Sequence, residues 1–456
     1  MGITDRLLNG KFSDVPHIPR KRAFLDSSNM IENPVAVMER YRKELGPTFS
    51  FHFGGAQQAV VSTEPEFLEV VLKHNKDMYV KSDIQTKHMV EFQGEGLVNI
   101  HGQAWLRQRK LVAQGFRPKR LADMLPMQFE ILDQLMVGFE QQAETGTVDM
   151  HAQMVRFTLA LVGKSIFGKA MTDDELQQIA DTIAQIQAYI VEMIVQPYKI
   201  PWFRITGRAD KYQQLRLAAD KLVLKHIEAR RAQGTGDADF LRILLDVPYH
   251  DTGKPMTEAQ ALIEAVQLMV AGNETSSNGL AWTFYLLGRH KSARDTVREE
   301  IDRVIGDGEV TFDKLYELEY TLQVIYEALR LYPPFWMIDR IALEDHEVLG
   351  VHIPKGAMVI PYIYGTHRNT DLWDDPETFE PARFNRENRK RHPFAYIPFG
   401  GGPRICVGNN MAIVNILLIT VWIMRKWDFE GTEDVAISPM MLLRPDGGVH
   451  QRFTRR

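Results

Sequence analysis

An apolar helical pattern runs from Thr257 to about Leu287 without a proline. Thr257 and Gln260 have the spacing of a capping box, which predicts that a helix begins there. About thirty residues rising 1.5 Å each span roughly 45 Å, so this helix needs a large core around it. Polar residues near its middle therefore need a structural or functional explanation.

The remaining pattern predicts a mainly α-helical fold with a small β-rich region. Helical periodicity dominates from about residue 102 to 332, and another helix is predicted to begin near Gly408. Phe49, Phe51 and Phe53 alternate with polar residues, as in a half-buried strand. The turns and the returning strand are predicted at Gly54-Gly55, Ala59–Val61, Ile353–Gly356 and Pro445–Gly448.

Length and composition indicate an ordinary globular protein. Its 456 residues would allow two or three domains, but no repeat or Gly/Ser linker divides them, so we expect one domain over residues 1–456. A net charge of −5 argues against a general nucleic-acid binder. The N-terminus lacks a long apolar run, and Met411–Ile423 is too short to span a bilayer. We therefore expect a cytoplasmic protein without a membrane anchor.

The only cysteine, Cys406, lies in the segment FGGGPRICVG at residues 399–408. Three glycines let the backbone approach a flat group closely and adopt positive φ angles. The helix predicted near Gly408 would stabilise a thiolate just before its first turn. A phosphate-binding loop would need a lysine and a Ser or Thr that are missing here, and a buried structural cysteine would not need the glycines or Arg404.

The order Phe-x-x-Gly-x-x-x-Cys-x-Gly resembles the haem-ligand signature of the cytochrome P-450 family. The resemblance implies haem b (iron protoporphyrin IX), with Cys406 as the axial ligand of the iron and Phe399 beside the cofactor. It also implies the family fold, a helical triangular prism with a small β region and a long central helix over the haem. Thiolate ligation favours O–O cleavage, which suits a monooxygenase.

Other segments match the family in the same order along the chain. Glu327 and Arg330 stand at i and i+3, and Arg383 follows in Phe379–Phe384, where Ala382 replaces the more usual glutamate. The family implies a buried structural network of these three side chains. The family also has one tryptophan and three arginines that bind the haem propionates. The residues of this chain that match them in spacing are Trp105, Arg109, Arg340 and Arg404.

The middle of the long helix reads Ala271-Gly272-Asn273-Glu274-Thr275, which is similar to the family's oxygen-activating motif. Gly272 would leave room for O2, Thr275 would bond back to the carbonyl of Ala271 and position protons, and Glu274 would relay them. The alternative is a threonine that satisfies its own hydroxyl while Glu274 faces water.

Apolar residues in the regions that line the family's substrate sites predict a lipid, terpenoid or aromatic substrate, with fatty acids still open. These residues are Ala271, Met89, Val90, Phe92, Leu97, Phe335, Trp336, Met337, Met440 and Met441. The stretch 189–203, with Pro197 and Pro201, is either a mobile lid or an ordinary core-facing helix end.

One cysteine cannot bind a four-cysteine cluster, and no dinucleotide fingerprint is present, so electrons from NAD(P)H need a separate ferredoxin or flavodoxin with its reductase. Basic residues predicted to dock this partner are Arg107, Lys110, Arg117, Lys119, Arg120 and the run 386–391. Two further functions remain open: a haem-thiolate enzyme that uses or rearranges peroxide, and a haem sensor without turnover. Glu274 and Thr275 favour the O2-dependent enzyme.

Overall fold

The computed structural model describes residues 10–53, 55–195, 199–233, 240–388, 390–431 and 433–456. The chain forms two compact units, and each takes chain from three places. Unit 1 comprises Met1–Asp83, Tyr326–Cys406 and Ile437–Arg444, and unit 2 comprises Ile84–Ile325, Val407–Ala436 and Pro445–Arg456. Since the units alternate along the chain, no single linker separates them. One domain over residues 1–456 stays a prediction.

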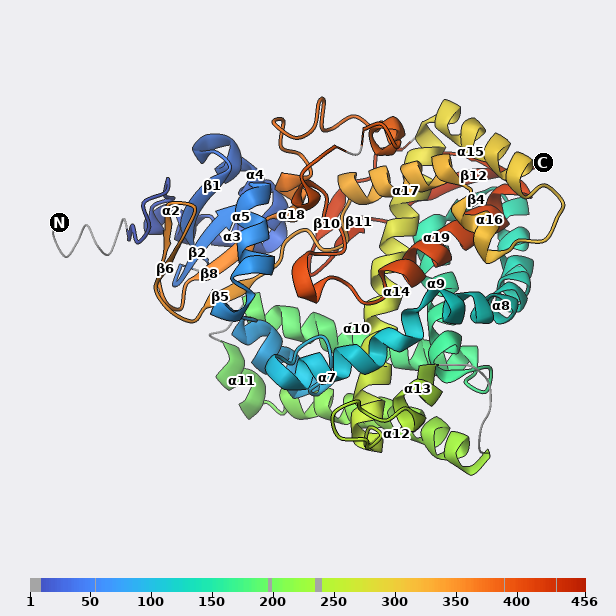
Figure 1. Ribbon diagram of the computed structural model, residues 1–456, viewed down its shortest axis with the longest axis horizontal. Helices are drawn as coiled ribbons and strands as arrows, with labels where there is room; N and C mark the ends of the chain where they lie inside the picture. The colour runs from blue at the N-terminus through green and yellow to red at the C-terminus, as the bar shows by residue number, and fades with distance from the viewer. Residues whose placement is uncertain (1–9, 54, 196–198, 234–239, 389, 432) are drawn as a thin grey trace. The chain divides into compact units, whose positions relative to one another are not determined.

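Unit 1 contains a five-stranded sheet in the order β1-β2-β8-β5-β3 (Figure 1). Its strands are β1 (Thr48–Phe53), β2 (Gln57–Ser62), β8 (Met358–Pro361), β5 (Arg340–Ala342) and β3 (Tyr79–Val80). The predicted hairpin is confirmed, with Phe49 opposite Val61; Gly54 of its turn lies outside the described residues. Ser50 and His52 are buried as well, because the ring of His17 hydrogen-bonds to the hydroxyl of Ser50 at 2.9 Å and the rings of Phe12 and His17 pack against His52.

Short helices complete unit 1: α2 (Arg20–Leu25), α3 (Ser27–Glu32), α4 (Pro34–Leu45), α5 (Pro65–Glu69), α18 (Ile363–Thr366) and the second half of α17 (Glu319–Leu331). A turn is present at the predicted Ile353–Gly356, where Ala357 donates its N–H to the carbonyl of Pro354 at 3.0 Å, but the strands on either side of it do not pair, so the predicted hairpin is wrong. Strands β6 (His346–Val348) and β7 (Val351–Ile353) form the hairpin instead, around Leu349 and Gly350. Leu349 and Gly350 have φ angles of 50° and 80°, as in a tight type I′ turn. Leucine rarely adopts a positive φ, so the sequence did not predict a turn there.

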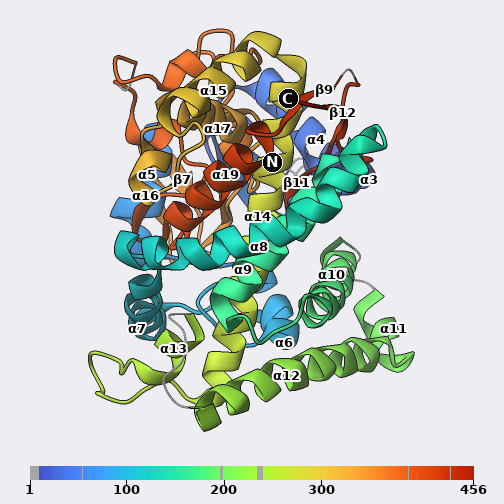
Figure 2. The same ribbon diagram turned by 90° about the vertical axis from the view of Figure 1, so that its right-hand side faces the viewer.

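Unit 2 is mainly helical. Its helices are α6 (Met89–Gln93), α7 (Gly102–Val112), α8 (Pro118–Glu144), α9 (Met150–Phe167), α10 (Asp173–Val195), α11 (Ile200–Ile205), α12 (Arg208–Gln233), α13 (Phe240–Asp246), α14 (Glu258–Arg289), α15 (Lys291–Val304), α16 (Phe312–Tyr316) and α19 (Asn409–Met424). The predicted long helix is α14, and Thr257 caps it by accepting a hydrogen bond from the backbone N–H of Gln260 at 3.2 Å. Helices α9, α12, α13 and α19 pack around α14 (Figure 2).

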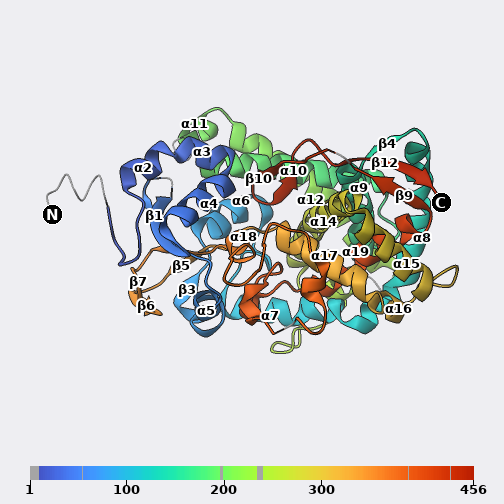
Figure 3. The ribbon, with the colours of Figure 1, turned by 90° about the horizontal axis from the view of Figure 1, so that it is seen from above.

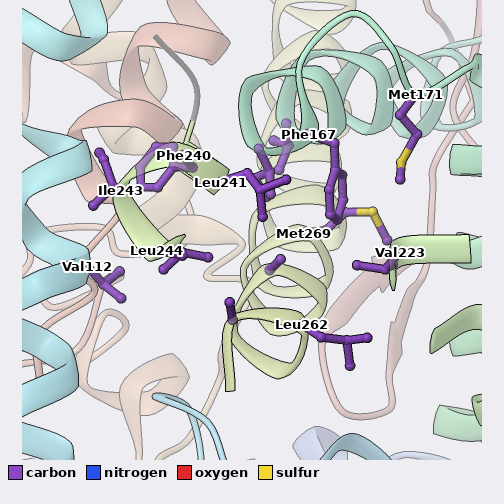
Figure 4. Close-up of a cluster of buried hydrophobic side chains, with 14 of the residues drawn as sticks. Val112, Phe167, Met171, Val223, Phe240, Leu241, Ile243, Leu244, Leu262 and Met269 are labelled. Atoms are coloured by element: carbon purple, nitrogen blue, oxygen red, sulfur yellow. The ribbon is translucent and has the colours of Figure 1, made fainter. Parts of the chain in front are cut away.

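The core of unit 2 surrounds the first half of α14 (Figure 4). Its apolar side chains include Leu262 and Met269 of α14, Phe240, Leu241 and Leu244 of α13, Phe167 of α9, Val112 of α7 and Val223 of α12. The predicted core helix at 411–423 is confirmed as α19, where buried Asn415 accepts a hydrogen bond from Gln128 of α8 at 3.2 Å. Among the described residues, no helix combines the length and hydropathy that crossing a membrane requires.

A three-stranded sheet in unit 2 has the order β4-β12-β9, with β4 (Thr147–Asp149), β12 (His450–Arg455) and β9 (Trp427–Glu430) (Figure 3). The terminal hairpin predicted around Pro445–Gly448 is therefore wrong: β11 (Leu443–Pro445) pairs with β10 (Ile437–Pro439). Gly447 and Gly448 do turn the chain, but the following Val449 donates its N–H to Asp149 at 3.0 Å, which directs the last strand onto β4.

Candidate functional site

The cysteine loop closes on itself within unit 1. The backbone N–H of Cys406 donates to the carbonyl of Phe399 at 2.9 Å, and Ile405 donates to Gly402 at 3.1 Å. Cys406 forms no disulfide and is solvent-exposed, three residues before α19 begins. A rigid backbone ring therefore presents an accessible thiol, which a core cysteine would not need.

The glycines of this loop have separate tasks. Gly400 and Gly402 have φ angles of 75° and 67°, so the predicted positive φ is confirmed at two positions. A side chain on Gly402 would also collide with the carbonyl of Leu72. Gly401 has an extended φ of −145°, and a Cβ there would lie 2.5 Å from the ring of Phe394. Gly401 thus makes room for protein, whereas the prediction assigned all three glycines to a flat ligand.

Earlier in the chain than the cysteine loop, Glu327 and Arg330 of α17 form a fully buried pair. Arg330 donates to both carboxylate oxygens of Glu327, at 2.6 and 2.7 Å, and to the carbonyls of His367 and Pro376 at 2.8 and 2.7 Å. The Nε of Arg383 lies 3.4 Å from Glu327. The structure therefore brings the three residues of the predicted network together.

His367, which sequence reasoning missed, connects this network to the segment before the cysteine loop. Its Nε2 accepts the backbone N–H of Ile397 at 3.0 Å, so its Nδ1 carries the proton and donates to the carbonyl of Arg330 at 3.2 Å. Burial, and then the charge of Arg330, lower the pKa of His367 well below its usual value. A neutral histidine is thereby fixed in one tautomer.

A second group of cations lies in unit 1, beside Asp339. Arg340 donates to the carbonyl of Asp339 at 2.8 Å, and burial lowers its pKa. Sequence reasoning missed Lys81, whose pKa falls to about 7 because of burial and then the charges of Arg404 and Arg340. Three cations with one carboxylate fit an anionic group. No periodic spacing marks Lys81, which follows the two-residue strand β3.

In unit 2, Trp105 and Arg109 of α7 interact as the spacing predicted. The guanidinium of Arg109 lies over the ring of Trp105, with its central carbon 5.7 Å from the ring centroid. This contact places a guanidinium, which can donate to a carboxylate, on the same face of α7 as the indole.

The polar motif of α14 lies at the predicted place. Thr275 donates to the carbonyl of Ala271 at 2.6 Å, which confirms the predicted bond, while α14 stays helical from Glu258 to Arg289. A Cβ on Gly272 would lie 3.0 Å from Val162 of α9. Gly272 thus allows close packing of α14 on α9. The place that a Cβ would take points toward α9, so this contact does not support the prediction that Gly272 makes room for O2. Ala271 itself is exposed.

The cytochrome P450 family model matches residues 18–451. The chain belongs to the cytochrome P450 family.

Relatives and a solved structure agree with this assignment. The chain is 28% identical to cytochrome P450 3A6 of Oryctolagus cuniculus over 85% of its length and 80% of that protein. It is 27% identical to cyclooctat-9-en-7-ol 5-monooxygenase of Streptomyces melanosporofaciens over 82% and 80%. The structure of retinoic-acid-bound cyanobacterial CYP120A1 matches with a TM-score of 0.82 and 24% identity, covering 94% of this chain and 96% of that one, which shows the shared fold.

As a P450, the protein is a monooxygenase of a family that uses haem and O2. Its residues fit that cofactor in two respects. The exposed thiol of Cys406 suits an iron ligand, and the cations Lys81, Arg340 and Arg404 of the same unit suit a propionate carboxylate.

The residues predicted for the substrate of this P450 have different surroundings. Phe335 and Met440 are 49% and 44% exposed. Trp336 is buried in the core of unit 1, where its indole N–H donates to the carbonyl of Met440 at 3.2 Å and its ring packs against Tyr362. Trp336 is therefore packed within the core of unit 1 and bonded to Met440, and its place in a substrate pocket stays a prediction.

The structure of the stretch 189–203 favours an ordinary core-facing helix end over a mobile lid. Tyr189 and Phe203 are both buried and their rings are 5.6 Å apart, in one cluster with Phe92. Pro197 lies outside the described residues. The two ends of the stretch are core-facing, and a mobile lid has no support among the described residues.

Several cations predicted to dock a partner of this P450 are already engaged. Arg107 pairs with Asp251 at 2.8 Å and Lys110 lies 3.2 Å from His250, whereas Arg391 donates to the carbonyl of Arg383 at 2.7 Å. Arg389 lies outside the described residues. The run 386–391 therefore includes a structural arginine as well as surface cations.

Proposed function

We propose that this protein is a haem-dependent monooxygenase that inserts one oxygen atom from O2 into an apolar organic substrate, with Cys406 as the axial ligand. The observation that carries the proposal is the exposed thiol of Cys406 in a backbone ring closed by its own N–H and the carbonyl of Phe399. Bound haem would supply the chemistry of O2 activation.

The residues of this chain would contribute binding and proton positioning. We propose that Trp105, Arg109, Arg340 and Arg404, joined by Lys81, bind the two propionates. The network of Glu327, Arg330 and Arg383 would support the cysteine loop without taking part in chemistry. These assignments rest on the donor types and on the family resemblance.

Proton delivery would depend on Thr275 and Glu274. The hydroxyl of Thr275 donates to Ala271, so its oxygen keeps lone pairs that can accept a hydrogen bond from water. Glu274 is partly exposed and stands next to Thr275, where a carboxylate can exchange protons with solvent. Thr275 would position the proton and Glu274 would relay it.

For the substrate we propose a lipid, terpenoid or aromatic compound. Apolar Phe335, Met337 and Met440 would contact it, together with Ala271. Cyclooctat-9-en-7-ol and retinoic acid, the compounds in the names of two similar proteins, are largely hydrocarbon, which supports this class. Electrons would come from NAD(P)H through a separate ferredoxin or flavodoxin and its reductase, and we expect the protein to be cytoplasmic with such carriers.

Spectroscopy and turnover test the proposal. The reduced carbonyl complex should show the red-shifted Soret band of thiolate ligation, and Cys406→His should move the band to a histidine-like position. A wild-type band at the histidine-like position in intact protein would exclude Cys406 as the ligand.

Turnover separates the three functions left open above. Product formed with reductant and O2 supports the monooxygenase, and product formed only with peroxide supports the peroxide-using enzyme. Haem binding with no product under either condition, across lipids, terpenoids and aromatics, supports the sensor.

A further inference from the structure

The loop at residues 94–99, between α6 and α7, is attached to α14 by side chains that the proposed mechanism does not use. Glu264 of α14 accepts the backbone N–H of Leu97 with both carboxylate oxygens, each at 3.1 Å. It also accepts from Gln260, at 3.1 Å, and Gln260 donates in turn to the carbonyl of Glu95 at 2.8 Å.

Gln267 makes the second attachment. Its side-chain oxygen accepts the N–H of Val98 at 3.1 Å, and its amide nitrogen donates to the carbonyl of Gly94 at 3.2 Å. A Cβ on Gly96 would lie 2.5 Å from the side chain of Gln267, so the glycine permits this close approach. One glutamine thus binds the loop at both ends.

The 94–99 loop also has internal bonds that keep its shape. Asn99 accepts the N–H of Gly96 at 2.9 Å and donates to the carbonyl of Gly94 at 2.8 Å. Gly94 has a φ of 75°, and a Cβ there would lie 2.8 Å from Ile263. These internal bonds define the shape of the loop independently of its bonds to α14.

The attachment lies on a functional face of α14. Glu264, Gln267 and Ala271 stand at i, i+3 and i+7, which places their side chains on one face of an α-helix. Gln267 is about one turn, and Glu264 about two turns, before the motif that contains Thr275. The loop is therefore attached to the same face of α14 that carries Ala271, one to two turns before it.

We propose that Glu264 and Gln267 are positioning residues that hold the 94–99 loop closed over this face of α14, and that release of the loop admits apolar substrate. The proposal rests on the proposed function, because it takes Ala271 and Thr275 to mark the oxidation site. Leu97, which the loop carries, is itself one of the predicted substrate-lining residues.

The carboxylate of Glu264 makes this attachment sensitive to pH. Glu264 is completely buried, and burial raises its pKa to about 7 although the bonds from Leu97 and Gln260 oppose the shift. Opening the loop would hydrate Glu264 and return its pKa toward 4.5. The closed state then binds the extra proton, so closure is favoured as pH falls and weakened as pH rises from 4.5 to about 7.

Other charged groups around this part of α14 have partners of their own. From α12, Arg216 lies 3.4 Å from Asp220 and donates to the carbonyl of Glu91 in α6. From α7, Arg107 pairs with Asp251. Burial, and then the charge of Glu264, raise the pKa of Tyr249, which follows α13. The shift of Glu264 is accordingly one of burial and not of ion pairing.

Hydrogen exchange at the amides of Leu97 and Val98 tests closure, whether or not haem is bound. In the wild type, protection corrected for intrinsic exchange should fall by roughly tenfold or more between pH 5.5 and 7.5. Glu264→Gln should remove this pH dependence and keep the protection high. Gln267→Met should lower protection at every pH without removing the pH dependence.

Glu300→Gln is the matched control. Glu300 is also a buried carboxylate that accepts two backbone N–H groups, from Tyr320 and Thr321 at 2.8 Å each, but it lies far from the loop in the sequence. This variant should keep the wild-type pH profile at Leu97. A wild-type profile that is flat, or a profile that Glu264→Gln does not change, would overturn closure by Glu264.

Binding of tert-butyl isocyanide, an uncharged ligand of ferrous haem, tests admission in the haem-loaded protein. Its association rate should rise between pH 5.5 and 7.5 in the wild type, stay low in Glu264→Gln and be raised in Gln267→Met. If hydrogen exchange at Leu97 and Val98 changes as expected but the association rates of the isocyanide do not, the gating role is overturned and the loop is a structural element. Protein that binds no haem would refute the proposed function, and the exchange measurement would still decide the attachment.

Discussion

Glu327 binds Arg330 through both carboxylate oxygens, at 2.6 and 2.7 Å, and neither side chain is exposed to solvent. Removing one partner of a buried pair leaves an uncompensated charge and costs about 3–5 kcal/mol. Glu327→Ala should therefore yield little haem-loaded protein and a lower urea midpoint. Glu377→Ala is the control, because Glu377 is 72% exposed in its pair with Arg368. Equal haem recovery from both variants would show that the buried pair is dispensable.

Thr275→Ala tests proton positioning on α14. The change removes one hydroxyl, which bonds only to the carbonyl of Ala271 among the described contacts, so haem content and substrate binding should stay nearly intact. Reductant should still be consumed while product falls and peroxide rises. Thr275→Ser keeps the hydroxyl and should restore most of the product formed per reductant. If Thr275→Ala couples reductant to product as well as the wild type does, the hydroxyl is structural.

Lys81 should take up a proton when haem binds. Its pKa of about 7 leaves it largely neutral at pH 8.5, and a propionate beside it would favour the ammonium form. Haem added to apoprotein in weak buffer should bind up to one more proton per molecule in the wild type than in Lys81→Met at pH 8.5. At pH 5.5 Lys81 is already charged, so the difference should vanish. Protons released by Cys406 occur in both proteins and cancel. An equal proton count at pH 8.5 would remove Lys81 from the propionate site.

Partner docking should depend on ionic strength if surface cations steer an acidic ferredoxin or flavodoxin. Donor-driven reduction should slow by roughly tenfold as salt screens these charges. Reversing Lys110, Lys119 and Arg389 to Glu should slow it similarly at low salt, with substrate affinity unchanged. Lys291→Glu, on α15, serves as the control for a charge change elsewhere. Indifference to both salt and reversal would refute electrostatic docking while leaving the enzyme assignment intact.

Local patterns predicted much of the fold and of the site. The capping pair at Thr257 and Gln260 located the start of α14. The i, i+3 spacing placed Glu327 and Arg330 on one helix face, and the family resemblance implied that the pair is buried. Each of these features depends on residues a few positions apart, whose geometry a helix determines. Periodicity is sufficient for such pairs.

Features that depend on distant segments could not be predicted in this way. His367 hydrogen-bonds to Arg330, which is 37 positions away in the sequence. The charges of Arg404 and Arg340 help to lower the pKa of Lys81, although both are far from it along the chain. The direction of Gly272 toward Val162 follows from how α14 packs on α9, which no motif records. Nothing near Glu264 in the sequence indicates that it is buried, and its bonds to the 94–99 loop join residues that are 167 positions apart.

The contact between Gly402 and the backbone of Leu72 limits how the cysteine loop can be exchanged between enzymes. The backbone at Gly402 lies against the chain at 70–74, a single π-helical turn, so the two segments match each other in shape. A chimera that receives only residues 399–408 from a relative would place a foreign loop on an unaltered support. Successful transplantation requires both segments from the same donor, although more than three hundred positions separate them in the sequence.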